Sequence, residues 1–306
     1  MSAAKPIIAV FGATGAQGGS VVRHLASDGR FAIRAITRNA AADKARELKE
    51  KYGAEVVEAD ASDAASYERA FAGAYGAFVV TAFWDPSSMG KEKEIGRGLV
   101  SAAKAAGVQH YVWSTLPFAR KESGGKYSVP HFDDKAEVDE DVRAAGFPYY
   151  TLFAAAFYYQ NFSSFFPIQK SEGGDLAVNI PDTSSITAYD VSQTGGIVAE
   201  IFHHREKWNG KYVAASADHF SLSEVEEVLT KAVGKKVQVN RVPRDVFANF
   251  GFPGAHELAE MFSWFNDYTY FGKHIKRETG LRAYPQLRTL EEYYADPEVL
   301  AKIPKF

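Results

Sequence analysis

The first half of the chain alternates short apolar runs with longer segments in which apolar residues recur every three or four positions. Short β-branched runs predict buried strands, and the longer spacing predicts helices that cover them. The predicted strands are Ile7–Phe11, Ala32–Thr37, Ala54–Glu58, Ala77–Thr81, His110–Ser114 and Tyr149–Phe153. The predicted helices are Gly18–Ser27, Ala40–Tyr52, Ser66–Phe71, Lys91–Ala106 and His131–Ala145. This order predicts an α/β fold with a doubly wound parallel sheet of Rossmann type.

Beyond Phe153 the alternation loosens and aromatic residues become frequent. A change of pattern at this point predicts a second, smaller α+β lobe. We therefore expect a nucleotide-binding sheet domain over residues 1–153 and a lobe for a substrate or partner over residues 154–306. Parts of the lobe can return to the sheet.

Two local signals predict helices in this lobe. Ser223 followed by Glu226 predicts a capping box that opens a helix over Glu224–Val233. The Gly-Phe-Pro-Gly segment at 251–254 predicts a break before another helix, because glycine and proline interrupt regular structure.

The composition is that of an ordinary globular protein. The 306 residues are 46% hydrophobic and 24% charged, and 35 basic against 38 acidic residues leave a net charge of −3. A chain with this charge balance has no large excess of positive charge to attract phosphate backbones, so we expect no direct binding of nucleic acid. The chain has no cysteine, no signal-peptide pattern and no apolar stretch near the roughly 20 residues of a membrane helix. We expect no membrane span, and a cytoplasmic protein with the nucleus as a second compartment.

A glycine-rich turn follows the first predicted strand and opens the first helix. It reads Gly12, Ala13, Thr14, Gly15, Ala16, Gln17, Gly18. Glycines let the backbone approach a pyrophosphate, and the helix N-terminus offers it N–H groups and a positive dipole end. The turn therefore predicts dinucleotide binding, with a strand-to-helix turn without ligand as the alternative. Gly125-Lys126 is followed by Tyr127, which excludes a P-loop there.

The second predicted strand ends in Thr37, Arg38 and Asn39. An NAD enzyme places an acid near this point for the ribose 2′-hydroxyl, whereas a guanidinium suits the 2′-phosphate of NADP(H). We therefore expect NADP(H) rather than NAD(H). The alternative is that Arg38 only solvates the end of a strand.

Further contacts to the cofactor are expected after the third and fourth strands. Asp60 and Asp63 fit the edge of an adenine pocket, although acids in a loop can equally form turns. Thr81, Ala82 and Phe83 are expected to run beneath the middle of the cofactor.

Candidate catalytic residues follow the fifth strand. Short-chain dehydrogenases, which have this fold, use a Ser at the end of that strand and a Tyr-x-x-x-Lys on the next helix. Here Ser114 ends the strand and Lys135 lies on the helix, but His131 stands where the Tyr would be. A neutral imidazole can relay a proton, so His131 and Lys135 are the catalytic candidates. The alternative for His131 is simple packing at the helix start.

Aromatic residues crowd after the sixth strand. Phe157, Tyr158 and Asn161 are expected at the cofactor, and rings here could wall a ligand pocket with Phe83 and Phe118, or simply form a core. The acidic residues at 133–141 predict a solvated helix face, and the His pair at 203–204 lacks a third ligand. We therefore expect no metal.

Several of these motifs together resemble the NmrA-like family of atypical short-chain dehydrogenases, and in particular its NADPH-sensing branch. The resemblance spans almost the whole chain. It rests on the sequences at 11–20 (FGATGAQGGS), 37–39 (TRN), 131–135 (HFDDK) and 251–255 (GFPGA), with Leu258-Ala259 and Met261-Phe262.

The resemblance implies NADP(H) binding and a smaller lobe that, in the regulators of the family, contacts other proteins in a manner that depends on the cofactor. The family also contains reductases, in which the helix lysine is implicated in catalysis. Lys135 thus inherits two roles, cofactor anchor or proton-transfer partner. Two functions stay open: a cofactor-state sensor that modulates a regulatory partner protein, and an NADPH-dependent reductase of an apolar or aromatic small molecule. The protein is expected to be a monomer or a homodimer.

Overall fold

The computed structural model describes residues 4–60, 63–86, 88–171 and 173–303. The chain forms two compact units that interleave along the sequence. The first unit comprises Met1–Leu116, Asp134–Ala154 and Ser192–Val213, and the second comprises Pro117–Asp133, Ala155–Val191 and Ala214–Phe306. One division therefore falls beside the boundary expected at residue 153, but each unit also borrows a segment from the other side of it.

The first unit contains a seven-stranded sheet in the order β11-β6-β5-β4-β1-β2-β3. Its strands are β1 (Ile7–Phe11), β2 (Ala32–Thr37), β3 (Glu55–Glu58), β4 (Gly76–Val79), β5 (His110–Thr115), β6 (Tyr149–Ala155) and β11 (Tyr212–Ala215). Neighbours from β3 through β6 pair in parallel. The strands β1, β2 and β3 follow one another toward one edge of the sheet, and the chain then returns to place β4 on the other side of β1. This reversal of strand order confirms the doubly wound Rossmann type.

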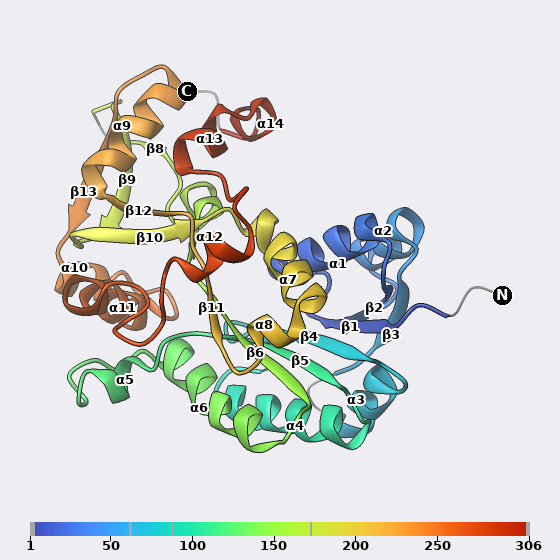
Figure 1. Cartoon of the computed structure of the whole chain (residues 1–306). Helices are drawn as coiled ribbons and strands as arrows, with labels where there is room; N and C mark the ends of the chain where they lie inside the picture. Colours follow the sequence, from blue (N-terminus) through green and yellow to red (C-terminus); the bar gives the residue numbers. More distant parts are fainter. Residues whose placement is uncertain (1–3, 61–62, 87, 172, 304–306) are drawn as a thin grey trace. The chain divides into compact units, whose positions relative to one another are not determined.

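Helices cover both faces of this sheet (Figure 1). Helices α1 (Ala16–Asp28) and α7 (Thr194–His203) lie on one face, and α3 (Ala64–Phe71), α4 (Glu92–Ala105) and α6 (Pro130–Ala144) lie on the other. The unit also contains α2 (Asp43–Tyr52), which contacts α1, and the short α8 (Arg205–Trp208). A side chain at Gly195 of α7 would place its Cβ 2.2 Å from the Ser20 carbonyl oxygen of α1, so glycine permits this close packing.

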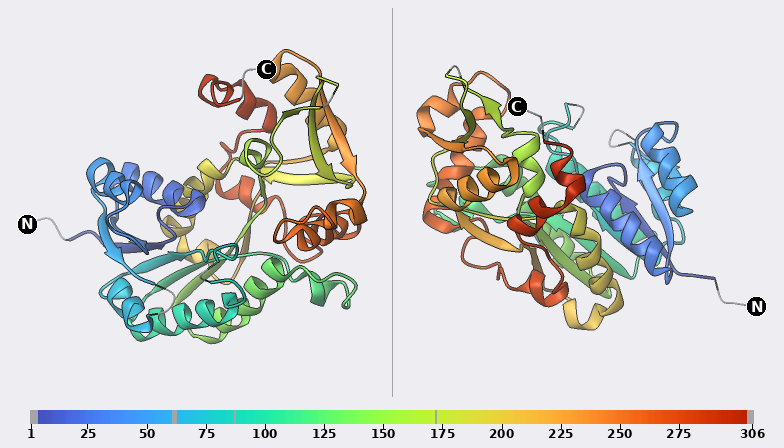
Figure 2. Two further views of the ribbon diagram at one scale, coloured as in Figure 1. Left: turned by 180° about the vertical axis from the view of Figure 1, so that it is seen from behind. Right: turned by 90° about the horizontal axis from the view of Figure 1, so that it is seen from above.

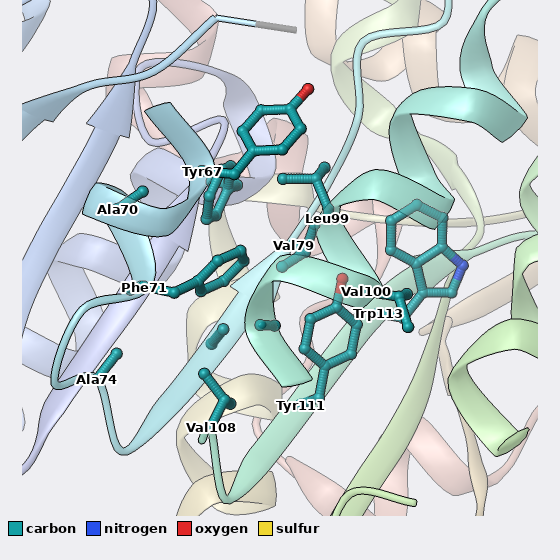
Figure 3. Close-up of a cluster of buried hydrophobic side chains, with 14 of the residues drawn as sticks. Tyr67, Ala70, Phe71, Ala74, Val79, Leu99, Val100, Val108, Tyr111 and Trp113 are labelled. Atoms are coloured by element: carbon teal, nitrogen blue, oxygen red, sulfur yellow. The ribbon is translucent and has the colours of Figure 1, made fainter. Parts of the chain in front are cut away.

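The core on the α3–α4 face is built from alternate residues of the strands. Tyr111 and Trp113 of β5 point to this face and meet Leu99 of α4 and Phe71 of α3, all nearly fully buried (Figure 3). Burial of such side chains contributes most of the driving force for folding, and it holds the loops after the strands in place.

The second unit contains two small sheets, ordered β12-β10-β7 and β13-β9-β8. Their strands are β7 (Phe157–Tyr158), β8 (Gln169–Lys170), β9 (Leu176–Pro181), β10 (Ser185–Tyr189), β12 (Asp218–Ser221) and β13 (Val237–Val242). The helices are α5 (Ala119–Glu122), α9 (Leu222–Val233), α10 (Arg244–Ala248), α11 (Ala255–Tyr268), α12 (Thr279–Ala283), α13 (Leu290–Ala295) and α14 (Pro297–Leu300), with 3-10 turns η1 (Tyr159–Ser163) and η2 (Val191–Gln193) beginning within it. Figure 2 shows these elements from two further sides.

The six predicted strands and five predicted helices of the first half are confirmed, with small shifts at their ends. The capping box expected at Ser223 and Glu226 was placed two residues too late. The Ser221 hydroxyl accepts from the Glu224 N–H, and the Glu224 carboxylate accepts from the Ser221 N–H, so α9 begins at Leu222. The spacing between Ser221 and Glu224 matches the capping motif as well as the later pair does. The break at Gly254 is confirmed, because this residue caps α11 with φ 89°.

Candidate functional site

The candidate site lies where the parallel strands of the first unit end. Since β1 is flanked by β2 and β4, the segments that follow these strands come together at the switch in strand order. The glycine turn, the Thr37–Asn39 segment and the Thr81–Phe83 segment all follow these strand ends. The topology therefore gathers at one edge most of the residues that the sequence predicts for the cofactor.

The glycine turn has a geometry that a larger residue would disrupt. Gly12 has φ 66°, in the left-handed region, and a Cβ there would lie 2.8 Å from Val80 Cγ1. At Gly18, the third glycine, a Cβ would lie 2.3 Å from the Gly12 carbonyl oxygen. Both glycines are thus required, because the turn packs closely on the start of its own helix and on Val80, directly after β4.

The start of α1 is open to a ligand. Gly15 is the N-cap residue, and among the described residues no side chain caps this helix end. Gly12, Gly15 and Ala16 are exposed, and Thr14 is half-buried. A 13-residue helix with an exposed, uncapped N-terminus presents backbone N–H groups and the positive end of its dipole, which suits a pyrophosphate. The residues present fit the diphosphate of a dinucleotide.

Gln17 links this turn to the end of β5. The Ser114 hydroxyl donates to Gln17 Oε1 at 2.9 Å, and both side chains are buried. The serine that would assist proton transfer in a short-chain dehydrogenase is hydrogen-bonded to the glycine turn in this structure.

Arg38 lies directly beyond β2, as expected, and forms an ion pair with a residue that the sequence did not single out. Its guanidinium is 2.7 Å from Asp85 Oδ2, with 53% of the arginine side chain and 21% of the aspartate side chain exposed. The hydrogen bond that the Arg38 guanidinium donates to Asp85 raises the pKa of Arg38, and the charges of Asp85 and Asp60 raise it further. The guanidinium is therefore charged at any physiological pH.

Asn39 and Asp63 have structural partners of their own. Asn39 Oδ1 accepts from the Ala41 N–H at 2.9 Å, which forms a turn before α2. Asp63 caps α3 by accepting from the Ala65 N–H, and the backbone of Asp60 is bonded to the Ser66 hydroxyl. These contacts match the turn-forming alternative for the two acids, and their place at an adenine pocket stays a prediction.

Lys135 lies in a buried polar cluster with two residues that follow β4. Its ammonium donates to Thr81 Oγ1 at 2.5 Å, to the Thr81 carbonyl at 3.1 Å and to Glu92 Oε1. The Thr81 hydroxyl also donates to Glu92 Oε1. Only 9% of the lysine side chain and none of the glutamate side chain is exposed, and the ammonium lies 5.8 Å from the centre of the Trp113 ring.

The second oxygen of this carboxylate, Glu92 Oε2, is buried and has no hydrogen-bond partner within the described part of the chain. A buried anion of this kind depends on the one cation that compensates it. Lys135 thus has a structural role in addition to any contact with a cofactor.

His131 has a different environment. The imidazole Nδ1 lies 2.5 Å from Glu257 Oε1, and the same oxygen accepts from the His131 backbone N–H at 2.7 Å. Both residues belong to the second unit, whereas Lys135, one turn further along α6, belongs to the first. The Glu257 contact supports the packing alternative for His131, and its catalytic role stays a prediction.

The three residues expected after β6 also lie in the second unit. Phe157 packs among the rings of Phe162, Phe166 and Phe262 with centroids 5.8 to 6.0 Å apart. Tyr158 makes an edge contact with Tyr189, and the Asn161 carbonyl accepts from the Phe166 N–H at 2.8 Å. These contacts build a core within the unit, and their part in a cofactor or ligand site stays a prediction.

The acidic helix does not simply present a solvated face, contrary to expectation. Asp133 and Asp139 are buried at 2% and 1% exposure. Asp133 accepts from the backbone N–H groups of Arg120 and Val129, while Asp139 Oδ2 accepts from the Tyr212 hydroxyl at 2.6 Å. Burial raises the pKa of Asp139 to about 7. Sequence periodicity missed both, because the partners of Asp133 are backbone N–H groups of the preceding segment and the partner of Asp139 lies 73 residues away.

Two further features were searched for across the chain. Within the ranges that the structure describes, no three His, Cys, Asp or Glu side chains are grouped so as to hold a metal ion. In those same ranges every helix is too short or too polar to cross a membrane.

Comparison with known proteins identifies the family. The model of the NmrA-like family matches residues 4–294. The chain belongs to the NmrA-like family. The resemblance seen in the sequence is thereby confirmed, and the GFPGA segment lies inside the matched region.

A relative resembles the chain in sequence, and solved structures resemble it in fold. The NmrA-like family domain-containing oxidoreductase himF of Aspergillus japonicus is 34% identical, over 87% of this chain and 86% of its own. NmrA, described as a negative transcriptional regulator and solved in complex with NADP, superposes with a TM-score of 0.84 at 24% identity, over 97% of each chain. The same regulator is also solved in complex with NAD. The NADPH-dependent quinone oxidoreductase QOR2 of Escherichia coli, complexed with NADPH, gives a TM-score of 0.74 at 24% identity, over 94% of this chain and 98% of that one.

Three acids that pair with the predicted site residues were not identified from the sequence. Asp85 pairs with Arg38, Glu92 with Lys135, and Glu257 with His131. Glu92 begins a helix and Glu257 lies in the first turn of another, where acids are common for their effect on the helix dipole. No spacing rule links any of them to its partner, since the two members of each pair lie 43 to 126 residues apart in the sequence.

Proposed function

We propose that this protein binds NADP(H) at the carboxyl edge of the sheet in its first unit and acts as a sensor of cofactor state toward a partner protein. The observation that carries the cofactor assignment is the pairing of an open, glycine-built start of α1 with a half-exposed guanidinium at the end of β2. The first suits a diphosphate, and the second suits the additional phosphate of NADP(H). The complexes of NmrA and QOR2 with nicotinamide cofactors support the same assignment.

Binding of NADP(H) can be tested by calorimetry on the wild-type chain and on Arg38→Ala. We expect the variant to bind NADPH about 10- to 100-fold more weakly, because a charge-assisted contact to phosphate is lost, and to bind NADH almost unchanged. Arg46→Ala is a matched control, since Arg46 is an exposed arginine of the same unit that pairs with Asp43. Failure of the wild-type chain to bind NADPH, or tighter binding of NADH than of NADPH, would contradict the assignment.

A sensing role is favoured over turnover by the environment of the usual proton donors. His131 replaces the tyrosine and is bonded to Glu257, Ser114 is bonded to Gln17, and the Lys135 ammonium is held by Glu92 and Thr81. A sensor works through different affinities of two cofactor states for one partner, so it requires no proton relay. Sizing and partner-binding measurements with NADPH, NADP and no cofactor test this role, and identical results in all three would contradict it.

A reductase of an apolar or aromatic small molecule is the second candidate. The name of the relative from Aspergillus japonicus, an oxidoreductase at 34% identity, favours it. Loss of NADPH absorbance with carbonyl, enone or imine compounds would establish turnover. The informative variant is Lys135→Met combined with Glu92→Leu, because it removes the ammonium without leaving a buried carboxylate unpaired. Turnover that disappears in this folded double variant while NADPH still binds with unchanged affinity would assign the proton transfer to Lys135, whereas weaker NADPH binding would assign it the role of cofactor anchor.

A further inference from the structure

The guanidinium assigned to the 2′-phosphate already faces an anion from its own chain. Asp85 Oδ2 lies 2.7 Å from Arg38, which is the distance of a charge-assisted hydrogen bond. Asp85 belongs to the segment after β4, whereas Arg38 follows β2, so two different strand ends supply the pair. A phosphate that takes the guanidinium must compete with this carboxylate.

The backbone around Asp85 is held by its own hydrogen bonds. The Asp85 N–H donates to the Ala82 carbonyl at 3.0 Å, and the Asp85 carbonyl accepts from the Ser88 N–H at 3.0 Å. The Ser88 hydroxyl closes the turn on the Ala82 carbonyl at 2.8 Å. This turn keeps the carboxylate beside Arg38, so a 2′-phosphate would meet a nearby like charge as well as a competitor.

A carboxylate at this place also suits the other form of the cofactor. In NAD enzymes of this fold an acid near the end of the second strand accepts a hydrogen bond from the ribose 2′-hydroxyl. In this protein the acid is Asp85, which belongs to the segment after β4, and it lies beside Arg38, the cation that favours phosphate. The same corner of the sheet therefore carries one group for each cofactor.

We infer that Asp85 is a second specificity-determining residue of this site, one that weakens NADP(H) binding and narrows the preference set by Arg38. This inference rests on the proposed function. It predicts a protein whose discrimination between NADP(H) and NAD(H) is modest and is set by the balance of Arg38 against Asp85.

The test is calorimetry with NADPH and NADH on the wild-type chain, Asp85→Asn, and Asp85→Asn combined with Arg38→Ala. We expect Asp85→Asn to bind NADPH about three- to tenfold more tightly, with NADH unchanged or weaker, because competition and repulsion are both removed. In the Arg38→Ala background the gain should shrink, since the competition needs the guanidinium. Asp43→Asn, at an exposed acid that pairs with Arg46, controls for the change in net charge.

The outcomes separate this inference from the proposed function. Wild-type chain that binds NADPH while Asp85→Asn shows no gain, or a gain shared equally by NADH, would overturn the role of Asp85 alone. A gain equal to that of Asp43→Asn would overturn it as well, because it would reflect net charge. Wild-type chain that binds neither cofactor would overturn both.

Discussion

Arg38 and Lys135 are two cations of one unit that receive carboxylates from the same stretch of chain, Asp85 and Glu92, yet their surroundings differ. The first pair is half-exposed on the arginine side, whereas the second is almost fully buried. Water and salt screen an exposed pair, so its net stabilisation is small and a ligand can displace it. A buried pair has lost its hydration, so each charge depends on the other.

This difference predicts which of the two ion pairs a bound cofactor can break. At Arg38 an incoming phosphate exchanges one anion for another at little cost to the fold. At Lys135 a ligand that took the ammonium away would leave Glu92 in an apolar interior. We therefore expect Arg38 to exchange Asp85 for the cofactor phosphate, and Lys135 to keep its ion pair with Glu92 whether or not the cofactor is bound. The following measurements test this difference between the two pairs.

The largest expected effect is on the buried pair. Lys135→Met should lower the free energy of unfolding by about 3 to 5 kcal/mol, because it strands the Glu92 carboxylate without its cation. Urea denaturation at neutral pH measures this loss. Adding Glu92→Leu should recover most of it. Arg97→Met is the matched control on α4, since Arg97 forms an exposed pair with Asp141. If Lys135→Met lowered the free energy of unfolding by less than about 1 kcal/mol, the buried pair would behave like an exposed one and the expected difference between the two pairs would be wrong.

Asp139 extends the comparison to a buried carboxylate whose hydrogen-bond partner is a tyrosine hydroxyl. Asp139, on the same helix as Lys135, has its pKa raised from 3.8 to about 7 by burial. Between these two values the native state binds more protons than the unfolded chain, so the free energy of unfolding should fall as pH rises from about 4 to about 7 and then level off.

Asp139→Asn should remove this decline, because the amide does not ionise. At pH 8 the variant should be more stable than the wild-type chain, with a difference on the order of a few kcal/mol. Thermal or urea unfolding across pH 5 to 8 measures it, with the exposed Glu140→Gln on the same helix as control. Parallel curves for the variant and the wild-type chain would contradict the assignment.

The smallest effect is expected at the exposed pair. Asp85→Ala should change the free energy of unfolding by at most about 1 kcal/mol, and the change should shrink at high salt. Urea denaturation at two salt concentrations measures it. A loss comparable with that of Lys135→Met would show that exposure is a poor guide to these two pairs.

The strand and helix pattern of the first unit could be predicted from the sequence because it depends on local periodicity. The short apolar runs, the longer helical spacings and the glycine turn at 12–18 are each visible within a short stretch of sequence. The second unit was less predictable. Its capping box at Ser221 was placed two residues late, since two serines each lie three residues before a glutamate.

The sequence by itself determined the fold class, the glycine turn, the cation beyond β2 and the lysine on α6, because each is defined by residue type within a short stretch. Only the tertiary structure decided which charges meet: Asp85 with Arg38, Glu92 with Lys135 and Glu257 with His131. These pairings depend on strand order and on how much water remains around each group. Neither quantity is local, so no pattern along the chain specifies it.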